Sequence, residues 1–236
     1  MSISQEIRIK QIALDSVVDY DKLPDYEKNL PSFWKYGEAI EETAYIAYKA
    51  KFIYHSEYEY FAYMGEDYFD AAYFLLETCL SDNTQHQADK WISPILFDVT
   101  QGIELYLKAI IVCFYVYQCG KEKKTETGHH NLMDYYNKVK EQLDEISNSN
   151  KVPADFTSAL QIVKNFIANI YEKIDDPTFV RYPTNGDHKN HFYLNERENT
   201  TIDLAVLKEQ MVVAYKMLDY LFWHTKELID LKYNQR

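Results

Sequence analysis

The sequence predicts an all-α fold, a bundle of about five to six helices with one long loop before the last helix. Apolar residues recur at steps of three and four over several long stretches, which is the period of an amphipathic helix. Only 6 Gly and 6 Pro occur among 236 residues, too few for a loop-rich or all-β fold. A chain of this length can bury a sizeable core as one domain.

The first 31 residues are the least regular part of the chain. Their isoleucines alternate weakly before a polar stretch that contains Pro24 and Pro31. We therefore expect an N-terminal arm or short edge element over residues 1–31 and a helical domain over residues 32–236.

Two helices are predicted at the start of that domain. The first runs from about Tyr36 to His55, where residues at helical steps are apolar or small. The second covers Glu57 to Leu80, and Gly65 weakens its middle. Its apolar face consists of Phe61, Met64, Tyr68, Ala71, Ala72, Leu75 and Leu76. The polar segment 81–90 that follows is typical of a loop.

A helix that is apolar nearly all round is predicted between Pro94 and Cys119, and such a helix should occupy the centre of the domain. Ser93 and Pro94 are expected to supply its N-cap and its first-turn proline. Gly120 ends the helix, and the lysines of segment 121–124 follow where positive charge favours a helix C-terminus.

Two shorter helices are predicted next, one from about Asn131 to Ile146 and one from Pro153 to about Ile174. A loop over residues 175–199 follows them. At roughly 25 residues it is longer than the usual connection in a compact domain, and loops of this length are often functional or disordered.

The final helix begins after that loop. Thr200 or Thr201 is expected to cap it, and its apolar residues repeat at helical steps from Leu204 to Phe222.

Three residues form a polar stripe on the central helix: Gln101, Glu104 and Lys108. A buried carboxylate or ammonium is costly unless it is paired or faces a cleft. Glu104 and Lys108 are four residues apart, the spacing at which side chains meet on a helix. The stripe is therefore either a buried ion pair or the wall of a site.

Net charge and cysteine use restrict the class of protein. A formal charge of −12 disfavours non-specific attraction of the whole surface to nucleic acid or anionic membranes, although a local basic patch is compatible with it.

The longest uncharged apolar run, Ala109 to Gly120, is shorter than the roughly 20 residues that span a bilayer. Cys79, Cys113 and Cys119 form no CxxC pair, which suits a reducing compartment. We expect a cytoplasmic protein without membrane insertion.

Two other site types are not favoured by the sequence. The tyrosine-rich stretch from Tyr54 to Tyr73 is acidic, whereas surfaces that stack nucleic-acid bases are basic. The histidine pairs His129-His130 and His188-x-x-His191 lack a clear third ligand, so no metal site is expected.

Three short segments follow one another in a distinctive order. They are I-E-L-Y-L-K-A at 103–109, G-H-H-N-L at 128–132, and an arginine with a later histidine, Arg181 and His188. In this order they resemble the HEPN family of all-helical domains, over roughly residues 55 to 230. In that family the central helix often reads hydrophobic-E-x-x-L-K-A, and the next helix is entered through H-N-L or H-D-L. The resemblance implies a HEPN-like bundle that pairs through its helices as a homodimer.

Many HEPN proteins are metal-independent ribonucleases whose signature is Arg, four to six residues, then His. Six residues separate Arg181 from His188. The resemblance implies that His188 transfers a proton and Arg181 clamps a phosphate, with RNA or a nucleotide as ligand, in a toxin, stress or phage-defence system. The residues it implies in support are Glu104, Lys108, His130 and Asn131. No cofactor is implied.

A second function stays open. In active members Asn, Asp or His usually follows the arginine and the motif continues into a helix, but here Tyr182 and Pro183 follow Arg181 and Gly186 precedes His188. Pro and Gly disfavour a helix at this point. The interrupted motif and the charge of −12 favour a catalytically inactive helical interaction module or an accessory subunit, with a partner protein from the same operon.

The supporting residues also have plainer explanations. Glu104 and Lys108 can be a purely structural pair, because oppositely charged residues at this spacing are common on helices. His130, at the start of a leucine-containing helix, can be a capping or core histidine.

Overall fold

The computed structural model describes residues 56–121, 131–147, 155–172 and 201–233. All of them belong to the second of two compact units of the chain, Tyr54–Arg236. The described residues form an all-α bundle, as predicted, and contain no strand. The helices are α4 (Glu57–Ser81), α5 (Gln87–Cys119), α6 (Leu132–Ser147), α7 (Phe156–Tyr171) and α9 (Leu204–Tyr233). The arm expected over 1–31 and the helix expected over 36–55 lie outside the described residues.

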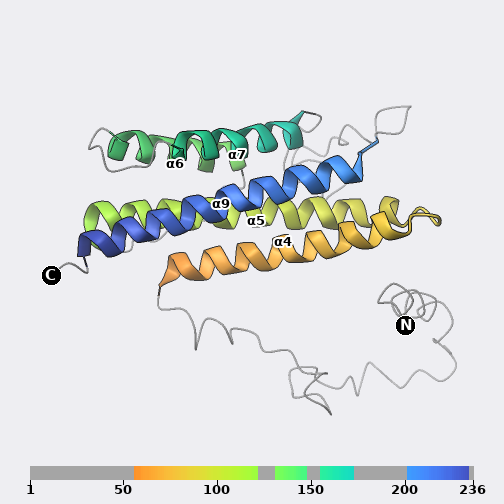
Figure 1. Ribbon diagram of the computed structural model, residues 1–236, viewed down its shortest axis with the longest axis horizontal. Helices are drawn as coiled ribbons and strands as arrows, with labels where there is room; N and C mark the ends of the chain where they lie inside the picture. Colours follow the sequence, from red (N-terminus) through yellow and green to blue (C-terminus); the bar gives the residue numbers. More distant parts are fainter. Residues whose placement is uncertain (1–55, 122–130, 148–154, 173–200, 234–236) are drawn as a thin grey trace, which may run out of the picture. The chain divides into compact units, whose positions relative to one another are not determined.

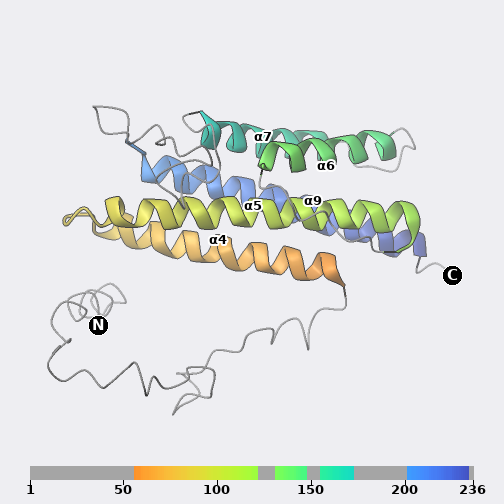
Figure 2. The ribbon, with the colours of Figure 1, turned by 180° about the vertical axis from the view of Figure 1, so that it is seen from behind.

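Helix α5 occupies the centre of the bundle, with α4 and α9 running along it and α6 and α7 forming a further layer (Figures 1 and 2). It packs against α4, α6 and α9, while α7 packs against α9 and α6. Helices α4 and α9 are antiparallel, because Glu59 pairs with Lys226 near one end and Glu77 pairs with Lys208 near the other.

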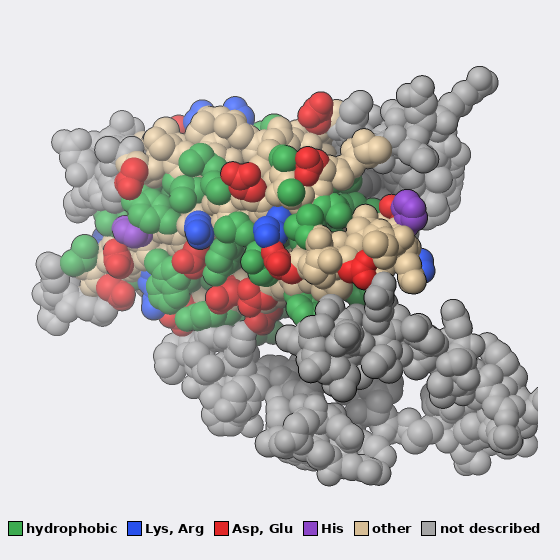
Figure 3. Space-filling model, turned by 45° about the vertical axis from the view of Figure 1, so that its right-hand side comes forward, with side chains coloured by type: hydrophobic (Ala, Val, Ile, Leu, Met, Phe, Trp, Pro, Cys, Tyr) green, Lys and Arg blue, Asp and Glu red, His purple; other side chains and the backbone are tan. Residues whose placement is uncertain are grey.

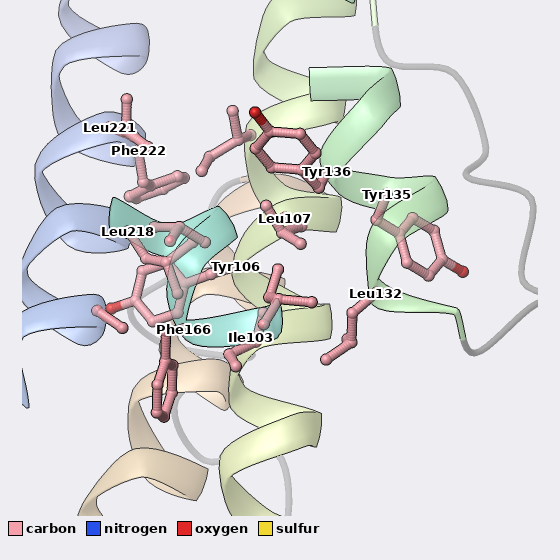
Figure 4. Packing of buried hydrophobic residues seen from close by; sticks show 14 of the residues in the cluster. Ile103, Tyr106, Leu107, Leu132, Tyr135, Tyr136, Phe166, Leu218, Leu221 and Phe222 are labelled. Atoms are coloured by element: carbon pink, nitrogen blue, oxygen red, sulfur yellow. The ribbon is translucent and has the colours of Figure 1, made fainter. Parts of the chain in front are cut away.

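The core confirms that the central helix is buried nearly all round. Figure 4 shows Ile103, Tyr106 and Leu107 of α5 among side chains from α6, α7 and α9. Ile103 and Leu107 are 0% exposed. Fully burying a side chain of this size contributes about 1.5 to 3 kcal/mol to folding. The burial of α5 therefore fixes which of its faces each neighbouring helix covers.

By length and composition α5 also meets the requirements for a membrane-spanning helix. However, 72% of its most apolar 18-residue window is buried inside the bundle. The central helix of a bundle has the same composition because it is surrounded by other helices.

The predicted start of the central helix was wrong. Helix α5 begins at Gln87, so Pro94 lies inside it rather than in its first turn. The extra residues are held by packing, since Ala88 is buried and Trp91 and Ile92 contact the core. In addition, the Asn83 side-chain oxygen accepts a hydrogen bond of 2.9 Å from the Ala88 N–H. These contacts outweigh the backbone hydrogen bond that a proline inside a helix removes.

The predicted cap of the final helix was also wrong. Asp203, not Thr201, caps α9, because its Oδ1 accepts hydrogen bonds from the N–H groups of Ala205 (3.0 Å) and Val206 (3.1 Å). The other candidate, Thr200, lies outside the described residues. The helix continues past Phe222 to Tyr233. This extension is what brings its last turn to the end of α5.

Helix α5 ends at the glycine that the sequence predicted. A lysine of α9 also lies at this end. Gly120 has a left-handed φ of 73°, and its N–H donates to the Val116 carbonyl at 2.7 Å. Lys232 of α9 donates to the Tyr117 carbonyl and lies over the Tyr117 ring. A cation at the C-terminus of a helix is favourable, and here α9 supplies one.

Helices α6 and α7 lie where they were expected. Helix α7 spans Phe156–Tyr171, whereas the predicted ends, Pro153 and Ile174, lie outside the described residues.

Candidate functional site

Glu104 and Lys108 form an ion pair inside the bundle. The Lys108 Nζ donates to the Glu104 Oε1 at 2.7 Å, and the two residues are only 7% and 3% exposed. The i, i+4 contact expected from the sequence is therefore present. Of the two alternatives for the stripe, the structure shows the buried ion pair. Gln101, the third residue of the stripe, is half-buried.

Helix α6 contributes an aromatic ring to this pair. The Lys108 Nζ lies 5.2 Å from the centroid of the Tyr135 ring, within the range of a cation–π interaction. Tyr135 is itself buried, and its hydroxyl points away from the labelled residues of α9 (Figure 4). The spacing of residues along the chain gives no sign of this contact, because Tyr135 and Lys108 belong to different helices.

The electrostatics of this cluster follow from its burial. Burial raises the pKa of the Tyr135 hydroxyl, and the neighbouring Lys108 acts in the opposite direction. The Lys108 ammonium thus lies close to both the Glu104 carboxylate and the Tyr135 ring. We call Glu104, Lys108 and Tyr135 the α5–α6 cluster.

Asn131 lies just before α6 and caps it. Its Oδ1 accepts a hydrogen bond of 2.9 Å from the Met133 N–H, and the Leu132 N–H donates to the Tyr171 hydroxyl at 3.3 Å. The structure therefore gives Asn131 a capping role at the entry to the helix that carries Tyr135. Its neighbour His130 lies outside the described residues.

Arg181 and His188, the predicted catalytic pair, also lie outside the described residues. The structure brings together Glu104 and Lys108 of the six predicted site residues, and it places Asn131 at the start of the neighbouring helix.

A second polar cluster lies between α4, α5 and α9 and was missed by sequence reasoning. The Asp219 Oδ1 accepts hydrogen bonds from the Trp223 Nε1 at 2.9 Å and from the Tyr106 hydroxyl at 3.3 Å. The Tyr215 hydroxyl donates to the Glu66 Oε1 at 3.3 Å. The spacing of Tyr215, Asp219 and Trp223, four residues each, is a signal that could have revealed a polar face on the final helix.

Burial governs the titration of this second cluster. It raises the pKa of Tyr215 to about 12 and shifts the pKa of Tyr106 upward as well. Burial also raises the pKa of the Asp219 carboxyl, while the hydrogen bonds from Trp223 and Tyr106 act against it. The cluster fastens α9 across both α4 and α5.

Of the three cysteines in the described segments, Cys119 is exposed and the other two are buried. No group of three or more His, Cys, Asp or Glu side chains that could hold a metal ion occurs in these segments. Cys79 and Cys113 are buried, and burial raises the pKa of the Cys79 thiol. On the face seen in Figure 3, carboxylates are more numerous than lysines and arginines among the described side chains.

Comparisons with protein-family models, with characterised proteins and with solved structures gave no significant match to this chain.

Proposed function

We propose that the protein is a HEPN-like endoribonuclease that acts on RNA without a metal, in a toxin, stress or phage-defence setting in the cytoplasm. The observation that carries this proposal is the α5–α6 cluster. Glu104 and Lys108 belong to the segment I-E-L-Y-L-K-A, and the helix packed against them is entered through Asn131 and Leu132. The helix that follows the second of the three segments therefore packs against the helix that contains the first.

The proposed reaction is attack of an RNA 2′-hydroxyl on the adjacent phosphate. The 2′-oxygen loses its proton to His188 and bonds to phosphorus, the bond from phosphorus to the 5′-oxygen breaks, and that oxygen takes up a proton. An imidazole suits this transfer because its ordinary pKa is near 6.5. Arg181, which is always charged, clamps the phosphate and stabilises the charge that develops on it.

The α5–α6 cluster supports these groups from a distance in the proposal. A lysine fixed between a carboxylate and an aromatic ring has few alternative positions, so it can hold a neighbouring backbone or loop in one arrangement.

Cleavage of RNA in the presence of EDTA tests the proposal. Wild-type protein should cut a mixed-sequence RNA, and Arg181→Ala and His188→Ala should each remove cutting without lowering the melting temperature. Lys140→Ala and His86→Asn are matched controls, because both residues are exposed and belong to neither polar cluster. RNA that stays intact with folded wild-type protein would contradict the proposal.

The second candidate is a catalytically inactive helical interaction module or accessory subunit. The observation that favours it is the pair of helix-disfavouring residues, Pro183 and Gly186, inside the Arg-His motif, together with the net charge of −12. Expression in bacteria separates the two candidates. An RNA-cleaving toxin should slow growth and its Arg181→Ala variant should not, whereas an inactive module should affect growth equally in both forms.

A further inference from the structure

Helix α4 is the most acidic of the described helices, with six carboxylates and no lysine, arginine or histidine among its 25 residues. Six negative charges equal half of the net charge of −12 that the whole chain carries. Of the described helices, α4 packs mainly against α5 and α9, and the side turned away from both contains exposed residues. The carboxylates belong to Glu57, Glu59, Glu66, Asp67, Asp70 and Glu77.

Four exposed residues form a row on that outer side, which we call the acidic stripe. It consists of Asp67, Asp70, Ala71 and Phe74. Residues of successive turns in this row are three or four positions apart, so they lie on one side of the helix. The Phe74 side chain is 48% exposed. The stripe therefore offers a partner two carboxylates and one aromatic ring.

The acidic surface continues from the stripe into the seam between α4 and α9. The two ion pairs at the ends of this seam fix the antiparallel register of the helices. Glu66 of α4 and Asp219 of α9 are each seven residues from one pair and eleven from the other, so this register places them opposite each other. Asp70 follows Glu66 by about one turn, which joins the stripe to the seam.

This part of the surface has an excess of negative charge that the described helices do not balance. None of the ion pairs among the described residues includes Glu66, Asp70 or Asp219. Like charges that face each other across a half-buried seam repel, and a cation placed between them would remove that repulsion. The charge of this surface is therefore complementary to a ligand with several positive charges.

We propose that the acidic stripe and the adjoining seam bind a basic segment of a partner protein. Its lysines or arginines lie beside Asp67, Asp70 and Glu66, and an apolar side chain covers Phe74. An arginine suits the seam best, because its planar guanidinium can donate to Glu66 and Asp219 at once. The inference does not depend on the proposed RNA chemistry, since it uses only residues of α4 and α9.

Other occupants fit this surface less well. RNA and anionic membranes carry the same sign of charge as the stripe and would be repelled. A second copy of the chain docked stripe to stripe would oppose like charges in the same way. A small organic cation would leave the Phe74 ring uncovered. A metal ion needs more ligands, and no group of three or more His, Cys, Asp or Glu side chains able to hold one occurs in the described segments.

Selection of peptides on the full-length chain tests the proposal. A display library of random peptides of about 16 residues, long enough for about four helical turns, is selected on the purified protein at about 0.15 M salt. The selected sequences should be rich in lysine and arginine and should share an apolar residue. One selected peptide is then synthesised as the probe, and its affinity is measured by calorimetry for wild type and for variants.

Asp67→Lys combined with Asp70→Lys should weaken binding of the probe at least about tenfold, because like charges then face each other. Phe74→Ala should weaken it about tenfold as well, as truncation of an aromatic anchor usually does. Glu141→Lys combined with Asp144→Lys on α6 is the matched control. These two carboxylates are also exposed and three residues apart, and their reversal should leave the affinity unchanged.

Three outcomes would overturn the proposal. The first is a selection that yields no binding peptides, or peptides without an excess of lysine and arginine. The second is an affinity that the α4 charge reversal or Phe74→Ala leaves unchanged. The third is equal weakening by the α6 control, which would show attraction to the acidic protein as a whole. All of the substituted side chains are exposed, so helical content measured on each variant verifies that folding is retained.

Discussion

Gly65 of α4 and Gly102 of α5 face each other where these two helices come close together. A Cβ on Gly65 would lie 3.1 Å from the Gly102 carbonyl oxygen, and a Cβ on Gly102 would lie 3.2 Å from the Gly65 carbonyl oxygen. The rings of Phe69 and Tyr106 pack beside them with their centroids 6.1 Å apart. The absence of both side chains therefore lets α4 lie directly against the central helix.

Alanine at either glycine should destabilise the protein. A Cβ at position 65 would lie 2.8 Å from a ring atom of Tyr106, and one at position 102 would lie 2.8 Å from a ring atom of Phe69. Overpacking of this kind costs about 1 to 3 kcal/mol, which exceeds the gain of about 1 kcal/mol in helix propensity. Urea unfolding of Gly65→Ala and Gly102→Ala measures the net loss. The exposed Asn137→Ala should be neutral or slightly stabilising, and a stabilising glycine variant would contradict the packing described here.

Lys108→Met should lower the free energy of unfolding by about 3 to 5 kcal/mol, because it removes the ammonium partner of a buried carboxylate. Replacing both residues with apolar ones, as Glu104→Leu with Lys108→Met, should recover much of that loss. Lys140→Met at an exposed position of α6 should change stability by less than about 0.5 kcal/mol. A small effect of Lys108→Met would instead indicate that water enters the cluster.

Asp219→Asn should stabilise the protein at pH 7, and this advantage should shrink as the pH falls. The pKa of the Asp219 carboxyl is higher in the folded protein than its ordinary value of 3.8, chiefly because of burial. The folded state therefore takes up a proton more readily than the unfolded state, and wild type gains stability as the pH falls through the folded pKa. Asparagine keeps an oxygen to accept from Trp223 and Tyr106. Urea unfolding at pH 7 and pH 4 tests this, and an equal difference at both would contradict it.

Glu77→Gln should show the opposite dependence. The hydrogen bond from Lys208 lowers the pKa of Glu77 below its ordinary 4.5, so the ionised pair contributes stability above that value and loses it as the pH falls through the folded pKa. The variant should be slightly less stable than wild type at pH 7 and equal to it in acid. Both residues of the pair are partly exposed, so a deficit that persists in acid would exclude the ion pair as its cause.

Tyr233→Phe should lower stability by about 0.5 to 1.5 kcal/mol, the usual contribution of one hydrogen bond. Its hydroxyl donates to the Tyr117 carbonyl at 3.1 Å and so ties the last turn of α9 to the end of α5. Leu231→Ala, two residues away and 59% exposed, serves as the control and should change little. Thermal unfolding compares the two variants, and equal melting temperatures would show that the hydroxyl contributes nothing there.

The sequence predicted the features that depend on the spacing of residues within one helix. The buried face of α5 followed from its apolar repeat, and the contact between Glu104 and Lys108 followed from their separation by one helical turn. The packing of Tyr135 on Lys108 could not be predicted, because it depends on how α6 lies against α5. The role of Gly65 could not be predicted either. Glycine is unfavourable within α4 itself, but the close packing of α4 against α5 requires a residue without a side chain at this position.

The predicted helix boundaries were wrong where tertiary contacts competed with local sequence signals. Pro94 indicates a helix start, but packing of the preceding residues and the bond from Asn83 extend α5 to Gln87. A threonine was predicted as the cap of α9, but Asp203 caps it, and a carboxylate is at least as good a cap as a hydroxyl. Arg181, His188 and His130 lie outside the described residues, so their roles stay predictions.

The central claim is that this chain cleaves RNA through 2′-hydroxyl attack. The terminal groups of the RNA fragments test it most directly. A defined oligonucleotide is incubated with wild-type protein in EDTA, and the products are identified by mass. The account predicts a 2′,3′-cyclic phosphate on one fragment and a 5′-hydroxyl on the other, with neither formed by His188→Ala. Fragments with 5′-phosphate ends, or no fragments from folded wild-type protein, would contradict it.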